Sequence, residues 1–134
     1  MQKKILIVDD DAELVELLRF NLKKAGFSIG TAANGAEALK KARSIRPNLI
    51  VLDVMMPELD GFSVCEILRR EKATASIPII MLTALASEFG RLTSLEAGAT
   101  EFLAKPFSPK AVVTRVKSLL KEPEPNNRCT AFPA

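Results

Sequence analysis

Five short apolar runs, each of strand length, alternate along this chain with longer amphipathic stretches. Three runs are apolar throughout, Ile5–Val8, Leu49–Leu52 and Ile79–Leu82, and weaker ones cover Phe27–Ala32 and Glu101–Leu103. Continuous apolar runs are typical of parallel strands that helices cover on both faces. After each run, apolar residues recur at helical spacing. The sequence therefore predicts an α/β fold, an open, doubly wound parallel sheet of five strands with helices on both sides.

Turn and capping residues bound several of the predicted helices. The first helix is expected to stop at Gly26, and the second to begin at an Asn34 cap and end before Pro47. Asp11 and Asp60 each stand just before a helical pattern, so we interpret both as N-cap or turn residues. These signals separate the five strand–helix units from one another.

Length and composition favour a single compact domain. The chain has 134 residues, of which 48% are hydrophobic and 26% charged. Proline and asparagine end the helical pattern from Glu122 onward, so we expect a domain over residues 1–121 and a linker or disordered tail over residues 122–134.

No apolar run approaches the roughly 18 residues of a membrane span, and the N-terminus lacks a signal-peptide pattern. Cys65 and Cys129 do not suggest a disulfide framework. The expected location is cytoplasmic, with no membrane partner.

The charged residues and the absence of histidine exclude or disfavour several classes of function. The formal net charge is +3, but the basic residues fall late in the predicted helices, where cations complement the negative helix end. We interpret them as solvated helix faces, including Arg43, Arg69 and Arg70, and expect no direct contact with nucleic acid. The chain contains no histidine, which excludes histidine metal sites, Ser-His triads and phosphohistidine chemistry within it.

Polar residues stand where four of the five apolar runs end. Asp9 and Asp10 follow the first run, Asp53 the third, Thr83 the fourth, and Lys105 comes shortly after the fifth. The carboxyl ends of parallel strands meet at one edge of the sheet, where ligands bind. Converging carboxylates repel one another, and a hard dication such as Mg²⁺ relieves that repulsion.

This set of groups suits phosphoryl transfer onto a carboxylate. Asp53 could attack a phosphoryl group while the metal and Lys105 neutralise charge on its oxygens. Thr83 could donate a hydrogen bond to one of those oxygens. Asp53 could instead be a simple helix cap, but that interpretation leaves Thr83 and Lys105 at the neighbouring strand ends unexplained.

Four stretches in order carry a resemblance to a known family. They are Ile7–Asp11, Leu52–Gly61, Met81–Ala84 and Lys105–Phe107. Each alone is a weak signal, but together, each at the end of a predicted strand, they are a strong one. Across roughly residues 3 to 121 the chain resembles a CheY-like response-regulator receiver domain of bacterial two-component signalling.

The resemblance implies a flavodoxin-like (βα)5 fold with strand order 2-1-3-4-5. It implies that Asp53 is the phosphoacceptor. Asp9 and Asp10 would then hold Mg²⁺ (or Mn²⁺), directly or through water, together with Asp53 and the backbone carbonyl of Met55. The chain would act as a signalling switch, and its only catalysis would be its own phosphorylation and slow autodephosphorylation.

The resemblance also implies how a phosphorylated state would be read. The Lys105–Pro106 bond is expected to be cis, which directs the ammonium into the site. Phe102 occupies the switch-aromatic position, paired with Thr83, and the switch would alter the surface of the fourth helix, fifth strand and fifth helix. Because phenylalanine replaces the commoner tyrosine, no phenol can hold either rotamer by a hydrogen bond.

Two further expectations concern lifetime and assembly. Met55 and Leu85, which flank the site, are apolar and cannot orient a hydrolytic water, so we expect a long-lived phosphorylated state. On the surface of the fourth helix, fifth strand and fifth helix, Arg91, Glu101 and Arg115 match a dimer-forming charge pattern. The acidic residues usual at positions 100 and 111 are absent. We therefore expect a monomer with an incomplete set of groups for phosphorylation-dependent dimerisation.

Several alternatives remain open at the level of sequence. The partner would be a sensor histidine kinase or a histidine phosphotransfer protein, and the output either a downstream effector domain or a separate protein. A stand-alone, non-phosphorylated interaction module on the same fold is the competing function.

A flavin-binding protein is disfavoured by the acidic residues after the first strand. A haloacid-dehalogenase-type hydrolase would need an aspartate where Met55 stands. The apolar stripe Phe89, Leu92 and Leu95 is interpreted mainly as core.

Overall fold

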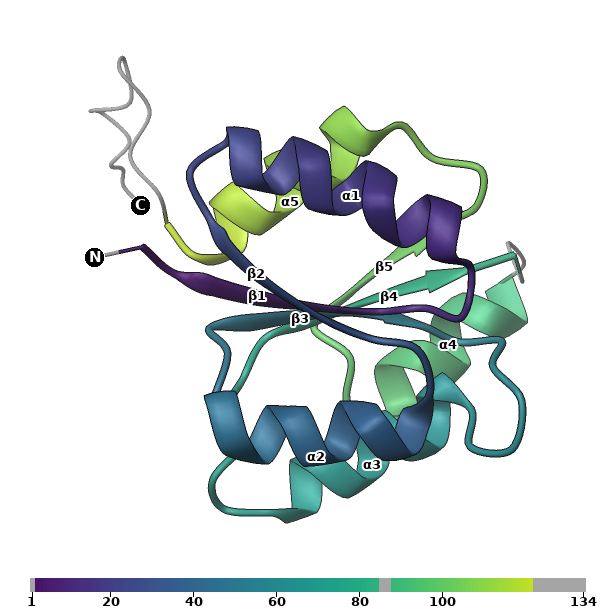
Figure 1. The fold of residues 1–134 in the computed structure, drawn as a ribbon. Coiled ribbons are helices and arrows are strands. Elements are labelled where there is room, and N and C mark those ends of the chain that lie inside the picture. Colours follow the sequence, from purple (N-terminus) through teal and green to yellow (C-terminus); the bar gives the residue numbers. More distant parts are fainter. Residues whose placement is uncertain (1, 85–87, 122–134) are drawn as a thin grey trace, which may run out of the picture.

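The computed structural model describes residues 2–84 and 88–121. Within that part, five parallel strands form one sheet in the order β2-β1-β3-β4-β5, and a helix follows each strand along the chain (Figure 1). This confirms the predicted fold class and strand order. The elements are β1 (Lys4–Val8), α1 (Ala12–Lys24), β2 (Ser28–Ala32), α2 (Gly35–Ile45), β3 (Leu49–Asp53), α3 (Gly61–Arg70), β4 (Ile79–Thr83), α4 (Glu88–Glu96), β5 (Glu101–Ala104) and α5 (Pro109–Leu119).

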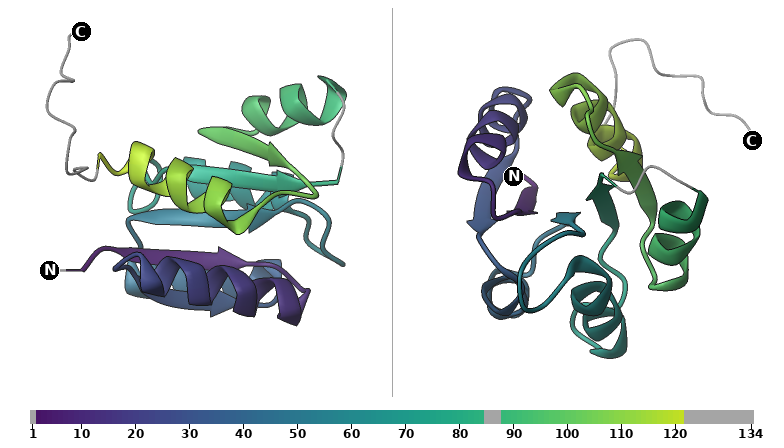
Figure 2. Two further views of the ribbon diagram at one scale, coloured as in Figure 1. Left: turned by 90° about the horizontal axis from the view of Figure 1, so that it is seen from above. Right: turned by 90° about the vertical axis from the view of Figure 1, so that its right-hand side faces the viewer.

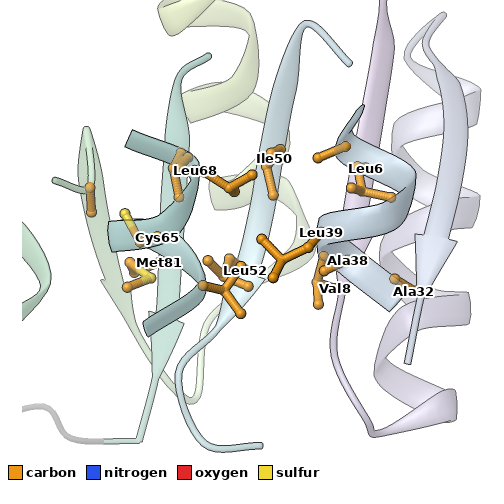
Figure 3. Packing of buried hydrophobic residues seen from close by; sticks show 14 of the residues in the cluster. Leu6, Val8, Ala32, Ala38, Leu39, Ile50, Leu52, Cys65, Leu68 and Met81 are labelled. Carbon is orange, nitrogen blue, oxygen red and sulfur yellow. The ribbon is translucent and has the colours of Figure 1, made fainter. Parts of the chain in front are cut away.

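The sheet is the middle of three layers. Helices α1 and α5 cover one face, α2 and α3 cover the other, and α4 lies near the edge strand β5 (Figures 1 and 2). Alternate residues of each central strand enter opposite cores: Leu52 packs on the α2 and α3 side (Figure 3), whereas Val51 packs on the α1 and α5 side. Both faces of β3 and β4 are buried, which explains why their sequences are apolar without alternation.

The strand register brings the carboxyl ends of β1, β3, β4 and β5 to one edge of the sheet. Asp53 and Thr83 are the last residues of their strands, Asp9 directly follows β1, and Lys105 directly follows β5. The Lys105–Pro106 peptide bond is cis, as expected. The predicted convergence of strand ends is therefore confirmed.

Capping follows the sequence closely. The side chains of Asp11, Asn34 and Asp60 each accept a backbone hydrogen bond at the start of a helix, which confirms all three predicted caps. Ser108 caps α5 in the same way. The chain turns after α1 at Gly26, whose φ of 104° lies in the left-handed region that favours glycine.

The interpretation of α4 as a core-facing apolar helix is wrong. Leu92 is 46% exposed and Leu95 is 39% exposed, while the side chain of Phe89 lies outside the described residues. Among residues 90–96, the buried positions are instead the small residues Gly90 and Ser94. Because small residues form the inner face, the two leucines project into solvent.

The late-helix basic residues are also more engaged than predicted. Lys41 donates to the carbonyl of Thr31, and Arg43 forms a two-pronged ion pair with Glu71. Arg69 donates hydrogen bonds to two separate loops. For Arg69 the solvated-face interpretation is therefore wrong, whereas Arg43 does lie on a solvated face, with its side chain 50% exposed. The predicted tail, residues 122–134, lies outside the described residues. No described helix combines the length and apolarity that a bilayer crossing requires.

Candidate functional site

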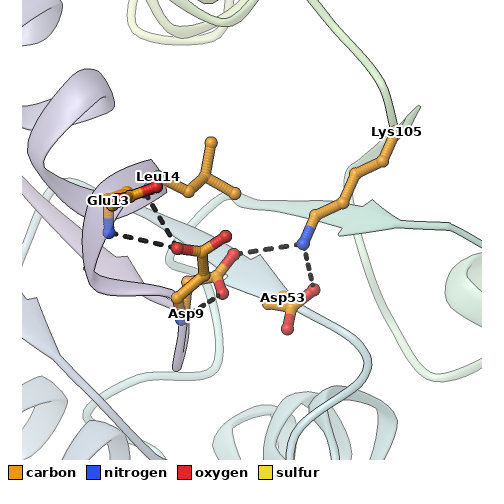
Figure 4. A network of polar contacts seen from close by, with 6 residues as sticks. Asp9, Glu13, Leu14, Asp53 and Lys105 are labelled. Atoms are coloured by element: carbon orange, nitrogen blue, oxygen red, sulfur yellow. Dashed lines mark hydrogen bonds and ion pairs between the residues drawn. The ribbon is translucent and has the colours of Figure 1, made fainter.

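One ammonium group links two buried carboxylates at the carboxyl edge of the sheet. The Nζ of Lys105 lies 2.9 Å from Oδ1 of Asp53 and 3.3 Å from Oδ2 of Asp9 (Figure 4). Asp9 is 2% exposed and Asp53 is 1% exposed. Because the two acids come from β1 and β3, which are neighbours in the sheet, and the lysine follows the edge strand β5, the fold itself brings these groups together.

A third carboxylate completes an acidic cluster. Oxygen atoms of Asp9, Asp10 and Asp53 all lie within 4.8 Å of one another. Asp10 is exposed, so the cluster opens to solvent on its side. The orientation of Asp9 is set locally, because its Oδ1 accepts a hydrogen bond of 2.9 Å from the backbone of Asp11. Asp11 caps α1 and lies outside the cluster.

Burial dominates the electrostatics of the two inner acids. Desolvation raises the pKa of Asp53, the hydrogen bond from Lys105 lowers it, and the nearby Asp9 charge raises it again, leaving it above its ordinary value. The pKa of Asp9 is raised by the same burial, against the hydrogen bond from Asp11 and the charge of Lys105. Burial lowers the pKa of Lys105, but its contacts with Asp53 and Asp9 outweigh this and raise it overall. One ammonium is therefore too little positive charge for this cluster.

The donor set fits a hard divalent cation. Three carboxylates face one ammonium, so acidic groups outnumber basic ones in the cluster by two. All its acidic ligand atoms are oxygens, and one side opens to solvent, which suits an ion such as Mg²⁺ that retains several waters. Asp9, Asp10 and Asp53 are the residues that would hold it. The Met55 carbonyl as a further ligand stays a prediction.

Thr83 and Phe102 lie on one face of the sheet. Thr83 is buried at the end of β4, and its carbonyl accepts a 2.7 Å hydrogen bond from the backbone of Lys105. Phe102 pairs in register with Met81, two residues before Thr83, so its side chain points to the same side as that of Thr83. Phe102 is half-buried and belongs to neither hydrophobic core. This placement agrees with the predicted pairing, whereas the switch role itself stays a prediction.

The loop between β3 and α3 passes very close to the backbone of Asp53. A Cβ atom on Gly61 would lie 2.3 Å from the Asp53 carbonyl oxygen, and the Gly61 amide donates to the carbonyl of Val54. Sequence reasoning assigned a cap or turn role to Asp60, gave Gly61 no role of its own, and missed this close approach. Met55, in the same loop, is 57% exposed beside the site. Leu85, its predicted counterpart, lies outside the described residues.

A shallow apolar cavity adjoins the lysine. It has a volume of about 420 Å³ and is lined by Leu14, Ala84, Lys105, Pro106 and Phe107. The cavity therefore joins the start of α1 to the loop that follows β5.

Comparison with known proteins agrees with this geometry. Residues 5–117 match the family model of the response regulator receiver domain. The alkaline phosphatase synthesis transcriptional regulatory protein PhoP of Bacillus subtilis is 51% identical over 124 residues, which is 92% of this chain and 51% of that protein. The transcriptional regulatory protein ResD of the same organism is 48% identical over 90% of this chain and 49% of its own length. The chain thus spans about half the length of these relatives.

Solved structures give the same result. A putative response regulator from Chloroflexus aurantiacus superposes with a TM-score of 0.86 at 38% identity, covering 91% of this chain and all of that one. The chemotaxis protein CheY4 of Vibrio cholerae superposes with a TM-score of 0.83 at 34% identity, over 88% of this chain and 98% of its own. With the matching family model, the strand order and the placement of Asp9, Asp53, Thr83 and Lys105, the chain belongs to the response regulator receiver domain family of two-component systems.

Proposed function

We propose that Asp53 accepts a phosphoryl group from a histidine of a partner kinase or phosphotransfer protein, in a reaction that requires Mg²⁺ or Mn²⁺. The observation that carries this proposal is the placement of the Lys105 ammonium, 2.9 Å from Asp53 and 3.3 Å from Asp9, beside a third carboxylate. The donor histidine lies outside this sequence, which contains no histidine. The chain is a switch and has no other substrate.

In the transfer, a carboxylate oxygen of Asp53 attacks the phosphorus of the donor phosphohistidine. The phosphorus–oxygen bond forms as the phosphorus–nitrogen bond breaks, and the electron pair returns to the donor imidazole. Lys105 keeps its proton and neutralises charge on the phosphoryl oxygens. When bound, the divalent cation supplies the remaining positive charge that this step needs. The shallow apolar cavity beside Lys105 offers a surface on which the donor protein can dock.

In this proposal, residues of the neighbouring strands β4 and β5 respond to phosphorylation. The Thr83 hydroxyl donates to a phosphoryl oxygen, and Phe102, on the same face, moves toward the space that Thr83 leaves. The surface of α4, β5 and α5 changes with it. In the present state Glu101 and Arg115 on that surface pair with each other at 3.1 Å. A dimer formed through this face must therefore open or share an ion pair that the monomer already satisfies.

The relatives favour transcriptional control as the output. PhoP and ResD are named as transcriptional regulatory proteins, and this chain matches about half of each. In this proposal the receiver domain serves a regulator of transcription through another part of the protein or a partner, and the receiver itself does not contact DNA.

Mass spectrometry after incubation with acetyl phosphate and Mg²⁺ tests the central claim. Wild type should gain the mass of one phosphoryl group, Asp53→Asn should gain none, and removing Mg²⁺ with a chelator should abolish labelling. Asp11→Asn is the matched control, because asparagine also caps helices and Asp11 lies outside the acidic cluster. Equal labelling of wild type and Asp53→Asn would end the proposal and favour a non-phosphorylated interaction module.

The lifetime of the phosphorylated state tests the role of Met55. This side chain is exposed beside the site and cannot orient an attacking water. Decay of the label, followed after the donor is removed, should be slow in wild type and in Met55→Leu but faster in Met55→Asn. Loss of the wild-type label within seconds would contradict this expectation.

A further inference from the structure

The guanidinium of Arg69 ties together two loops at the edge of the sheet opposite Asp53. Its Nε donates to the carbonyl of Gly98 at 2.8 Å. One terminal nitrogen donates to the carbonyls of Ala75 at 3.1 Å and Ile77 at 2.7 Å, and the other lies 3.4 Å from the hydroxyl of Thr100. Arg69 belongs to the last turn of α3, so one side chain connects α3, the loop before β4 and the loop before β5.

The segment Ala97–Thr100, which we call the α4–β5 corner, fits closely around this side chain. Gly98 has a φ of 108°, and a Cβ atom there would lie 2.7 Å from Cγ of Arg69. The Thr100 amide donates to the carbonyl of Ile79 at 2.8 Å, and the Thr100 hydroxyl accepts from the Ile79 amide at 3.0 Å. The corner is therefore held both to α3 and to the first residue of β4.

The helix that precedes the corner buries little apolar surface in the part whose side chains are described. Among residues 90–96, the part of α4 whose side chains are described, no large apolar side chain is buried. Gly90 and Ser94 face inward, and the buried Ser94 hydroxyl has no hydrogen-bond partner among the described residues. In contrast, Ala97 and Ala99 of the corner belong to the hydrophobic core. Within residues 90–100, burial of apolar side chains is thus concentrated in the corner.

We propose that Arg69 is a positioning residue that fixes the α4–β5 corner in both switch states. The rearrangement that follows phosphorylation is then confined to the N-terminal part of α4, residues 88–93. This inference rests on the proposed function for its trigger. The N-terminal part follows Thr83 along the chain at the site edge of the sheet, whereas the corner lies at the far edge. Arg69 therefore makes one end of α4 the fixed point about which the other end responds.

Hydrogen exchange of the unphosphorylated protein, measured by NMR, tests the anchor itself. Arg69→Met removes the hydrogen bonds and keeps an unbranched apolar stem, and Arg70→Met on the exposed neighbouring position is the matched control. In Arg69→Met, amides of the α4–β5 corner should exchange about tenfold faster or more than in wild type, since hydrogen bonds from a charged group are among the stronger ones. Arg70→Met should match wild type. Equal amide exchange rates of the corner in Arg69→Met and Arg70→Met would overturn the anchoring role of Arg69.

Comparing the free and phosphorylated wild type tests the confinement of the response. Exchange of residues 88–93 should change, while that of the α4–β5 corner should stay the same. In Arg69→Met the change should spread into the corner, with phosphoryl incorporation on Asp53 unaltered. An equal change in both parts of the wild type would overturn the inference. If Arg69→Met does not fold, Arg69→Lys, which cannot reach all four acceptors, replaces it. Absence of label on wild-type Asp53 would instead contradict the proposed function, and the anchor would still be measured in the free protein.

Discussion

Helices α3 and α4 cover neighbouring parts of the sheet but are attached to it in different ways. Helix α3 buries Val64, Cys65 and Leu68 against the central strands. The described part of α4 turns glycine and serine inward and exposes Leu92 and Leu95. The firmly packed elements hold Asp9 and Asp53 in place, whereas residues 90–96 of α4 bury little apolar surface. A small change in free energy at the site can therefore alter α4 without disturbing the core.

Replacing a leucine by alanine in each of the two helices should show most clearly how differently they are packed. Leu68→Ala removes a side chain that is 1% exposed and leaves a cavity, so it should lower the free energy of unfolding by about 2–5 kcal/mol. Leu95→Ala removes one that is 39% exposed and should change the free energy of unfolding by about 0.5 kcal/mol or less. Urea unfolding followed by far-UV circular dichroism measures both. Similar losses in the two variants would contradict the comparison.

The contrast also explains which parts of the structure could be predicted from sequence. The runs Leu49–Leu52 and Ile79–Leu82 revealed strands buried on both faces, and strand direction alone then brought Asp53, Thr83 and Lys105 to one edge. Those inferences needed only local patterns and a general rule of parallel sheets. The predicted caps held for the same reason, because a cap depends on neighbours within a few residues.

The failures concern residues whose role depends on distant partners. Helical spacing located the apolar side of α4, but in residues 90–96 the side that faces inward carries Gly90 and Ser94 instead. Arg69 looked like any cation near a helix end, since its acceptors Ala75, Ile77 and Gly98 are brought to it only by the fold. Similarly, the need for glycine at position 61 follows from the path of the β3–α3 loop across the Asp53 backbone.

Close backbone packing in the firmly held region provides a second test. Gly61→Ala would place its Cβ 2.3 Å from the Asp53 carbonyl oxygen, a backbone atom that cannot move away easily, so it should cost about 1–3 kcal/mol of stability and reduce phosphoryl labelling. The control Gly30→Ala meets no backbone atom, only the ends of the Ile45 and Leu6 side chains, at 3.0 and 3.7 Å. It should change stability by about 0.5 kcal/mol or less. If both variants unfold at the same urea concentration as wild type, the Asp53 backbone has more freedom than this contact implies.

Removing either of two buried hydroxyls should change the stability of the protein, but in opposite directions. The Ser94 hydroxyl in α4 is buried without a hydrogen-bond partner in the described part of the chain, so Ser94→Ala should stabilise the protein by about 1 kcal/mol. The Thr74 hydroxyl, after α3, donates to the carbonyl of Leu68 at 2.7 Å, so Thr74→Val should destabilise it by about 1 kcal/mol. Thermal unfolding of the two variants beside wild type provides the measurement. A loss of stability in Ser94→Ala would show that α4 is better packed than its buried surface indicates.

The smallest expected effect is a pH-dependent one at the start of α2, which is also in the firmly packed region. Glu37 accepts a 2.8 Å hydrogen bond from the Ala33 amide and pairs with Lys41 at 3.2 Å, and these contacts lower its pKa below the ordinary value of 4.5. Because the folded state favours the charged form, its contribution is present above the unfolded-state pKa and is lost as pH falls through the lower folded-state pKa.

Glu37→Gln isolates that charge, since glutamine can still accept from the Ala33 amide. At neutral pH the variant should be less stable than wild type by roughly a few tenths of a kcal/mol, because Glu37 is 38% exposed and its pairing is screened by water. Urea titrations at successively lower pH should show this difference disappear below the pKa of Glu37. Glu66→Gln, on the exposed face of α3, should show no such trend. A difference that persists unchanged into acid would mean that packing of the side chain, rather than its charge, stabilises the start of α2.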